Sequence, residues 1–377
     1  MIIHVVRQGD TLYKIGELYN MDYKKIAEDN KIPLDKTLVV GQTIVVIPDT
    51  NTRKYKQITV NGYAFTNIDR VILDDVLPSL TYLSIFRYST DPDGNLNTIN
   101  DEELIAIAKG NDVVPIMVIT NIGLEDRFDS DLAHAILNNE DAQNRLITNI
   151  LSVMRLKGYG GLNIDFEYVY PEDKEAYINF LKKAKTELEK NNYLLSVALV
   201  PKYSDDQEGL LYEAHDYSQI GEIADYVILM TYEWGYSGGP ARAVAPVNLV
   251  ERVLDYATKK IPNNKMLLGI PNYGYDWTLP YVEGNLARSV GNYEAVDIAN
   301  YYRQSINYDY EEQSPYFNYY DSDSFEHEVW FEDARSIQAK LELVIKYNIE
   351  GVSYWKIDKF FPQNYLILNH LFAIKNH

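Results

Sequence analysis

After residue 55 the chain alternates short apolar runs, rich in β-branched and aromatic residues, with amphipathic helical stretches. The runs contain few polar residues, as expected of parallel strands that are covered on both faces. Eight such strand–helix units predict an α/β fold, a (β/α)8 TIM barrel, whereas a doubly wound sheet would not need eight strands. The eight predicted strands are Ile58–Phe65, Tyr82–Tyr88, Val113–Thr120, Gly161–Glu167, Leu194–Val200, Tyr226–Tyr232, Met266–Asn272 and Gly351–Ile357.

The stretch between the seventh and eighth predicted strands is unusually long. It runs from Tyr273 to Glu350, which is more than one loop and one helix need. Two segments within it, Tyr316–Tyr320 and His327–Phe331, have the composition of strands. We therefore expect a small α+β insertion at this point of the barrel.

The first 49 residues carry a different pattern, with a strand at residues 4–6, two helices and a last strand that follows Gly41. Asp10 or Thr11 is suited to cap the first helix, and the second helix is expected from Asp22 to Asn30. The polar stretch after Pro48 has no apolar period and predicts a linker at residues 50–55. The expected organisation is a small βααβ domain at residues 1–49 and a barrel at residues 56–377.

Composition excludes several function classes. Asp and Glu total 55 against 35 Lys and Arg, a net charge of −20, so we expect no nucleic-acid partner and no anionic membrane partner. The chain has no cysteine, which rules out disulfides and thiolate chemistry, and its six histidines lack metal-ligand spacing. We expect no metal and no cofactor. The N-terminus lacks the basic start and long apolar stretch of a signal peptide, so we expect none. The oligomeric state is left open.

The chemistry is concentrated at the fourth predicted strand, Gly161–Glu167. Alternate side chains on a strand share a face, so Asn163, Asp165 and Glu167 are expected inside the barrel. Barrel interiors are normally filled by branched apolar residues, and buried acids are costly unless they are paired or functional. A structural polar network is the alternative to a catalytic site here. Functional sites of this fold lie at the carboxyl ends of the strands, which is where Glu167 falls.

This stretch resembles the D-G-x-D-x-D-x-E signature of glycoside hydrolase family 18. In register, Gly161 is the signature glycine, Asp165 the last aspartate and Glu167 the catalytic glutamate, while Gly160 and Asn163 replace the first two aspartates. Further residues agree with the family: Met230, Tyr232 and Glu233 of its M-x-Y motif, Trp355 at the eighth strand, and Tyr63, Gly269, Pro271, Tyr273 and Gly274.

The resemblance implies substrate-assisted retaining hydrolysis, in which the sugar's acetamido group supplies the nucleophile. Glu167 would be the acid and base, Asp165 would orient the acetamide, and Tyr232 would bind its oxygen. Asn163 is counted with the substrate-binding residues, and as an amide it can donate a hydrogen bond to Asp165. The other implied substrate contacts are Trp355 as the floor under the sugar, Tyr63 and Tyr273 near it, Met230 and Glu233.

Residues 6–12, Asn30 and residues 38–48 resemble the LysM domain, which binds glycans that contain N-acetylglucosamine. The implied glycan contacts are Gly9, Asp10, Thr11, Leu12, Ile32 and Pro33.

A LysM module before such a barrel resembles the cortical-fragment-lytic N-acetylglucosaminidases of endospore-forming bacteria. That resemblance implies hydrolysis of N-acetylglucosamine bonds in peptidoglycan, in spore cortex fragments during germination, by a protein associated with the spore coat and cortex. Two alternatives stay open: a chitinase that cleaves chitin oligomers, and a non-catalytic glycan-binding coat protein.

Overall fold

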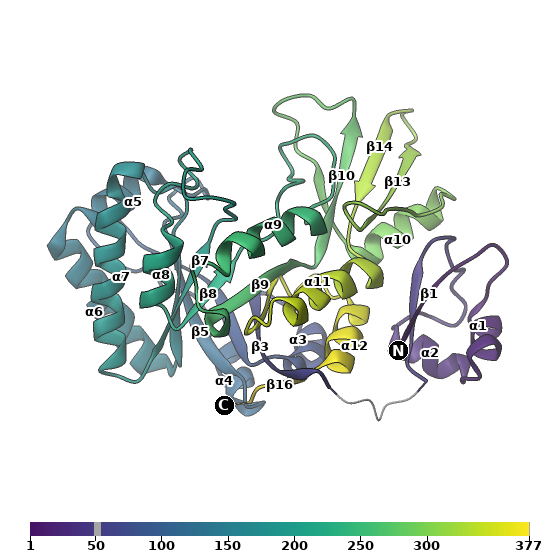
Figure 1. Ribbon diagram of the computed structural model, residues 1–377, viewed down its shortest axis with the longest axis horizontal. Coiled ribbons are helices and arrows are strands. Elements are labelled where there is room, and N and C mark those ends of the chain that lie inside the picture. The colour runs from purple at the N-terminus through teal and green to yellow at the C-terminus, as the bar shows by residue number, and fades with distance from the viewer. Residues whose placement is uncertain (49–53, 377) are drawn as a thin grey trace.

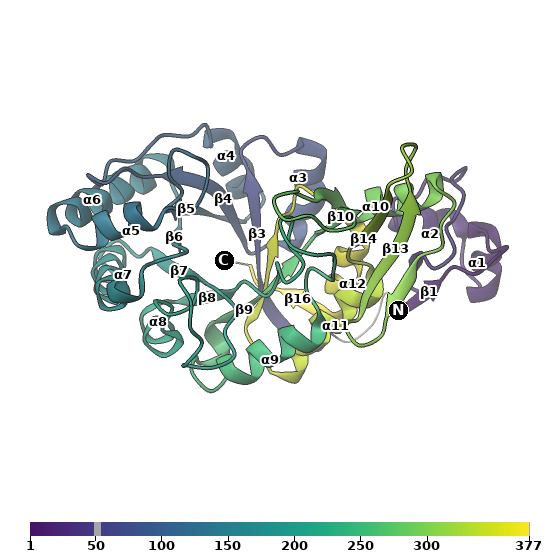
Figure 2. The same ribbon diagram turned by 90° about the horizontal axis from the view of Figure 1, so that it is seen from above.

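The structure is a computed structural model that describes residues 1–48 and 54–376. Eight parallel strands form a closed barrel, because the last of them pairs with the first (Figures 1 and 2). All eight predicted strands are confirmed: one end of each coincides with the prediction, and the other differs by one to three residues. They are β3 (Lys56–Phe65), β4 (Tyr82–Ser89), β5 (Val114–Thr120), β6 (Gly161–Asp165), β7 (Leu194–Leu199), β8 (Tyr226–Leu229), β9 (Met266–Pro271) and β15 (Gly351–Trp355).

Helices surround the barrel and bury the outer faces of its strands, as the view from above shows (Figure 2). Phe166, just after β6, stacks between Tyr177 and Phe180 of α7, which fixes the outward side of the functional strand. The outer helices are α3 (Arg70–Val76), α4 (Glu102–Gly110), α5 (Ser130–Leu137), α6 (Glu140–Lys157), α7 (Lys174–Glu189), α8 (Tyr217–Ile223), α9 (Val247–Ala257), α11 (Ala334–Lys346) and α12 (Pro362–Leu371). A short strand, β16 (Phe372–Ile374), extends the barrel beside β3.

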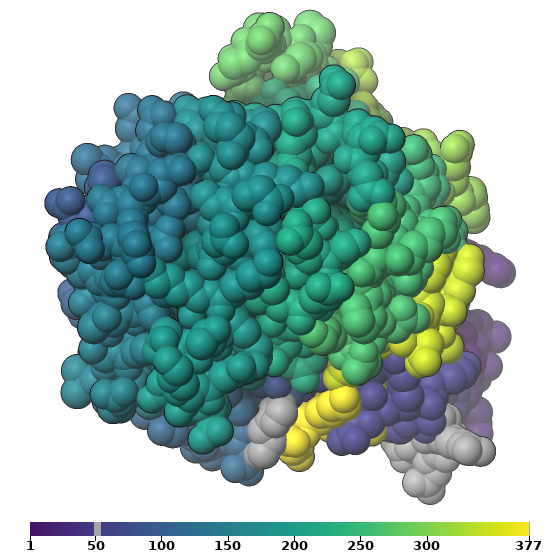
Figure 3. Space-filling model, turned by 60° about the vertical axis from the view of Figure 1, so that its left-hand side comes forward, coloured from purple at the N-terminus to yellow at the C-terminus, as the bar shows by residue number. Residues whose placement is uncertain are grey.

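The predicted insertion between β9 and β15 is confirmed. It is an antiparallel sheet in the order β11-β10-β14-β13-β12, packed against α10 (Asn292–Tyr301), and it projects from the barrel surface in Figure 3. The two segments predicted to be strands are β13 and β14. The strand bounds are β10 (Tyr273–Leu279), β11 (Arg288–Gly291), β12 (Asn307–Asp309), β13 (Ser314–Tyr320) and β14 (Glu326–Trp330).

The N-terminal module has the predicted βααβ order: β1 (Ile2–Val5), α1 (Leu12–Tyr19), α2 (Tyr23–Asp29) and β2 (Thr43–Val46). Thr11 and Asp22 cap its two helices, as their residue types predict. The predicted linker at residues 50–55 lies mostly outside the described residues, so the domain boundaries remain a prediction. Within the described ranges, no helix combines the length and apolar character needed to span a bilayer.

Candidate active site

The candidate site lies at the carboxyl end of β6. Strand β6 ends at Asp165, so Glu167 lies two residues beyond the strand rather than on it. Asn121, a fully buried residue after β5, holds the backbone of Glu167 in place of a strand ladder. The Asn121 Oδ1 atom accepts the Glu167 N–H at 2.9 Å, and Asn121 Nδ2 donates to the Glu167 carbonyl at 2.8 Å. Sequence reasoning missed Asn121, because only its position directly after a strand distinguishes it.

Asn163 lies beneath the acidic pair, fully buried inside the barrel. Its Oδ1 accepts a hydrogen bond from the Tyr63 hydroxyl, and its Nδ2 donates to Ser196 Oγ, both at 2.9 Å. The predicted hydrogen bond from Asn163 to Asp165 is wrong: the amide donates to Ser196 and makes no bond to Asp165 among the described residues. The Oδ1 atom of Asp165 is buried without a hydrogen-bond partner among the described residues.

The two carboxyls of the site have raised pKa values. Asp165 is only 6% exposed, and burial raises its pKa to about 7. Burial also raises the pKa of Glu167 well above its ordinary value, and the nearby charges of Asp165 and Glu233 raise it further. A carboxyl with a raised pKa keeps its proton near neutral pH, so this pair can supply a general acid.

Tyr232 and Glu233 follow β8 at the barrel mouth, the end of the barrel where the strands have their carboxyl ends. Strand β8 lies across the barrel from β4. Burial raises the pKa of Tyr232 well above its ordinary value, so its hydroxyl stays protonated and can donate a hydrogen bond. Glu233 adopts a left-handed backbone with φ of 64°. Its carboxylate accepts hydrogen bonds from the Tyr273 hydroxyl and, at 3.0 and 3.2 Å, from the Tyr275 hydroxyl. Sequence reasoning missed Tyr275, although it follows Tyr273 by two residues and so shares its face of β10.

Trp355 ends β15 and is partly exposed at the mouth. Its ring centroid lies 4.9 Å from that of Phe86, 5.4 Å from Tyr63 and 6.3 Å from Phe65. Tyr63 lies next to Trp355, as the sequence predicts. The hydroxyl of Tyr273 instead donates a hydrogen bond to Glu233. Together these rings form an apolar surface suited to the face of a sugar.

The remaining sequence-predicted contacts fall into two groups. Met230 is half-buried after β8, and its N–H donates to the Leu199 carbonyl at 2.9 Å. In the module, Gly9, Thr11 and Pro33 are exposed, and Asp10 is half-buried with His4 Nε2 at 3.0 Å.

Leu12 and Ile32 are only 5% and 6% exposed and pack in the module core. Their side chains face the core, and a glycan contact at these two positions stays a prediction. In residues 1–48 and 54–376, no group of three or more His, Asp or Glu side chains is arranged to hold a metal ion.

Comparison with known proteins places these features in two families. A model of glycosyl hydrolases family 18 matches residues 46–359, and a LysM domain model matches residues 4–46. A cortical fragment-lytic enzyme of Bacillus subtilis (strain 168) is 39% identical, with 99% of each chain covered, and that of Bacillus anthracis is 40% identical, with 99% of this chain and 98% of that protein covered.

Solved structures agree. The spore cortex-lytic enzyme SleL of Bacillus cereus matches with a TM-score of 0.94 and 35% identity, covering 100% of this chain and 99% of that chain. A chitinase of Chromobacterium violaceum matches with a TM-score of 0.78 at 24% identity over 83% of this chain and 98% of that one, a likeness of fold alone.

Proposed function

The chain belongs to glycosyl hydrolases family 18 and carries a LysM domain, and from this we propose that it cleaves N-acetylglucosamine bonds in spore cortex peptidoglycan. The observation that carries the proposal is the Asp165–Glu167 pair, two acids with raised pKa values at the carboxyl end of a barrel strand. The likeness to cortical fragment-lytic enzymes over 99% of the chain supports the choice of substrate.

The reaction begins with the protonated carboxyl of Glu167, which donates its proton to the glycosidic oxygen. As the bond from that oxygen to C1 breaks, the carbonyl oxygen of the 2-acetamido group forms a bond to C1, which gives an oxazolinium ion. Glu167, now ionised, removes a proton from a water molecule. The water oxygen attacks C1, and the bond from C1 to the acetamido oxygen breaks, which opens the oxazolinium ring and restores the acetamido group. The two displacements at C1 retain the anomeric configuration, and Glu167 ends the cycle protonated.

Asp165 and Tyr232 act on the acetamido group. The carboxylate of Asp165 accepts the acetamide N–H, whose positive charge grows as the oxazolinium ring closes. The protonated hydroxyl of Tyr232 donates to the acetamide oxygen and aims it at C1. Trp355, with Phe86 and Tyr63 packed against its ring, is the floor under the reacting sugar.

The LysM module binds the glycan in this proposal. Its exposed loop positions Gly9, Thr11 and Pro33, with the partly exposed Asp10, are the contacts retained from the sequence. The protein therefore acts on the spore, where cortex peptidoglycan is its macromolecular partner.

The test is to incubate the chain with soluble cortex fragments and, separately, with chitin oligomers, and to follow the products by mass spectrometry. We expect fragments with a new N-acetylglucosamine reducing end from cortex, at a higher kcat/KM than from chitin. The reverse preference would make the chain a chitinase. Binding to cortex with no product from either substrate would make it a glycan-binding protein and contradict the proposed hydrolysis.

A further inference from the structure

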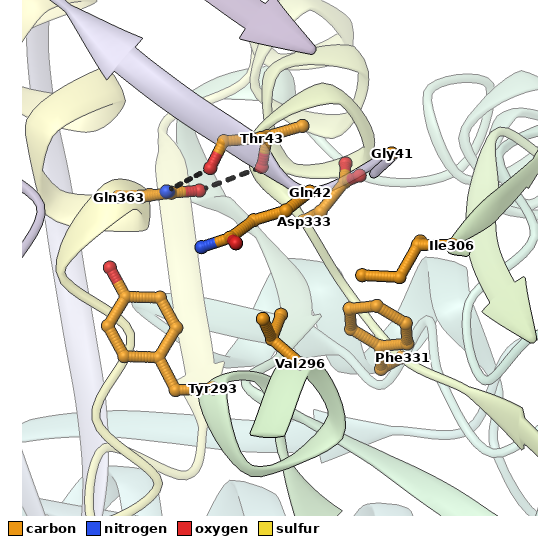
Figure 4. A pocket seen from close by; sticks show the side chains of 9 residues that line it. All are labelled: Gly41, Gln42, Thr43, Tyr293, Val296, Ile306, Phe331, Asp333 and Gln363. Carbon is orange, nitrogen blue, oxygen red and sulfur yellow. Dashed lines mark hydrogen bonds between the residues drawn. The ribbon is translucent and has the colours of Figure 1, made fainter. Parts of the chain in front are cut away.

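The LysM module is docked on the barrel rather than held only by the chain that joins them. It packs beside the insertion and against the starts of α11 and α12 (Figure 1). The seam between them, defined by residues 39–43 of the module and by Tyr293, Ile306, Phe331, Asp333 and Gln363, contains a gap of only about 10 Å³ (Figure 4). A gap of that size is close to the least that holds one water molecule, so the surfaces are closely packed at the seam. Beside it, a hollow of about 380 Å³ opens between Lys31 of the module and Pro362 of the barrel.

Gln363, on α12, is the polar centre of the seam and is only 1% exposed. Its Oε1 accepts the Thr43 hydroxyl at 2.9 Å, and its Nε2 donates to the Thr43 carbonyl at 2.7 Å (Figure 4). The same Nε2 donates to Asn30 Oδ1 at 3.0 Å, while Asn30 itself is bound to the Val45 backbone within the module. Tyr293 of α10 adds a hydrogen bond from its hydroxyl to the Asn30 carbonyl. Buried amides satisfied in this way fix one docking geometry.

Apolar contacts join the module to the insertion. Val39 belongs to the hydrophobic core of the insertion, with residues of α10, β13 and β14 around it. The Ile306 N–H donates to the Val40 carbonyl at 2.9 Å. Gly41 has φ of 87°, and a Cβ there would lie 1.9 Å from the Ile306 carbonyl oxygen, so only glycine fits. The module thus completes the core on which the insertion sheet rests.

The same sheet reaches the active site. Strand β14 pairs with β10 in a register that places Trp330 opposite Tyr275. Tyr273 and Tyr275 of β10 donate to the carboxylate of Glu233, the residue after Tyr232. A path of packed residues therefore runs from Val39 through the insertion sheet to Glu233, a carboxylate close enough for its charge to raise the pKa of Glu167.

We propose that the LysM module is a positioning element of the catalytic site: by docking through Asn30, Thr43 and Val39 it fixes the insertion, and the insertion fixes Glu233 beside Glu167. The module then contributes to the hydrolysis of soluble fragments, which need no anchoring. This inference rests on the proposed hydrolysis.

The test uses the full chain with Gln363→Glu, which sets a carboxylate against the Thr43 carbonyl and Asn30 Oδ1. The matched control is Gln338→Glu, the same change on α11, where the Gln338 side chain bonds only Glu342 in the described part of the chain. Displacing groups at an active site slows catalysis, so we expect kcat/KM on soluble fragments to fall about five- to twentyfold in Gln363→Glu and to stay unchanged in the control.

The pH profile separates positioning from simple loss of stability. Asp165 and Glu233 are the charged groups that raise the pKa of Glu167. If Glu233 moves away, the pKa of Glu167 falls, and the alkaline limb of kcat shifts to lower pH. Tyr293→Phe, which removes only the hydroxyl bond to Asn30, is the milder variant should Gln363→Glu fail to fold, with about a two- to fivefold loss expected.

Folded variants with parental kcat/KM and an unmoved pH profile would overturn the inference. So would a rate that falls only in step with the folded fraction measured by circular dichroism. If the parent chain itself releases no product from soluble fragments, it is the proposed function that fails, because that experiment involves no seam variant.

Discussion

The mouth of the barrel and the seam with the module both bury polar side chains, but they satisfy them differently. At the seam, the amide of Gln363 has partners for both its oxygen and its nitrogen. At the mouth, Asp165 is almost as deeply buried, yet its Oδ1 has no partner in the described chain. An unsatisfied buried polar group costs about 1–3 kcal/mol. The hydrogen bonds of Gln363 therefore stabilise the folded chain, whereas the buried carboxyl of Asp165 contributes no such bond through its Oδ1.

This difference predicts opposite consequences for substitutions. A change at the mouth removes a group that the folded chain does not need, so it should lower the rate and spare the stability. A change at the seam removes partners that the folded chain does use, so it should act on stability and reach the rate only through the insertion.

The largest effect is expected from Glu167→Gln. The amide keeps the shape of the side chain but cannot transfer the proton, so turnover of soluble cortex fragments should fall about 10²–10⁴-fold. The two hydrogen bonds from the Asn121 side chain to the backbone of Glu167, here called the Asn121 clamp, are unaffected. The melting temperature should therefore stay within a few degrees of the parent. Glu172→Gln, an exposed acid nearby, is the control. Turnover within a few-fold of the parent would exclude Glu167 as the acid.

Asp165→Asn should separate rate from stability most clearly. The amide can still bind the acetamide but carries no charge, so kcat should fall about 10–10²-fold. The pKa of Glu167 should also fall, because Asp165 helps to raise it, and the alkaline limb of kcat should move to lower pH. A limb that moved upward would contradict this account of the acidic pair.

The stability of Asp165→Asn has a definite sign. The carboxyl of the folded chain keeps its proton up to a pKa of about 7, while that of the unfolded chain loses it near its ordinary value. The unfolded state thus loses protons first, and parental stability declines as pH rises from about 4 to 7. An asparagine cannot ionise, so the variant does not lose stability in this way. We expect urea denaturation to find the variant more stable than the parent above pH 7 and the difference to disappear below about pH 4.

The barrel and its acidic strand could be predicted from the sequence because both leave local patterns. Apolar runs mark the eight strands, and the alternation of Asn163, Asp165 and Glu167 places three polar groups inside. The Asn121 clamp and the Gln363 seam could not be predicted, because each joins residues far apart in the chain. The partner of Asn163 was wrongly predicted for the same reason. Ser196 lies on the next strand, β7, and no local sequence pattern pairs it with Asn163.

Asn163→Asp should have a modest effect on rate. Asn163 takes no part in proton transfer, so we expect activity within about tenfold of the parent. The new carboxylate can accept hydrogen bonds from Tyr63 and Ser196, whose hydroxyl can rotate to donate. If it shares a proton with Asp165, the alkaline limb stays in place, and if it ionises, the limb moves to higher pH. A limb that moved to lower pH, measured on a soluble fragment with folding checked by circular dichroism, would contradict the arrangement.

The smallest effect is expected at the exposed loops of the module, which belong to neither the mouth nor the seam. Pro33→Glu removes an exposed apolar contact from the proposed glycan loop. Leu18→Glu makes a similar change at an exposed position of α1 that is not among the predicted glycan contacts. We expect Pro33→Glu to weaken pelleting with insoluble cortex by about two- to fivefold, since only one contact among several is lost. Leu18→Glu should pellet like the parent.

Both module variants should hydrolyse soluble fragments at the parental rate, because neither changes a residue of the seam. This outcome would separate two roles within one small module: its loops bind the insoluble glycan, and its docked face supports catalysis. If Pro33→Glu lowered the soluble rate as much as Gln363→Glu does, loop and seam would not be independent. The effect of Gln363→Glu could then not be assigned to the insertion, because any disturbance of the module would reach the active site.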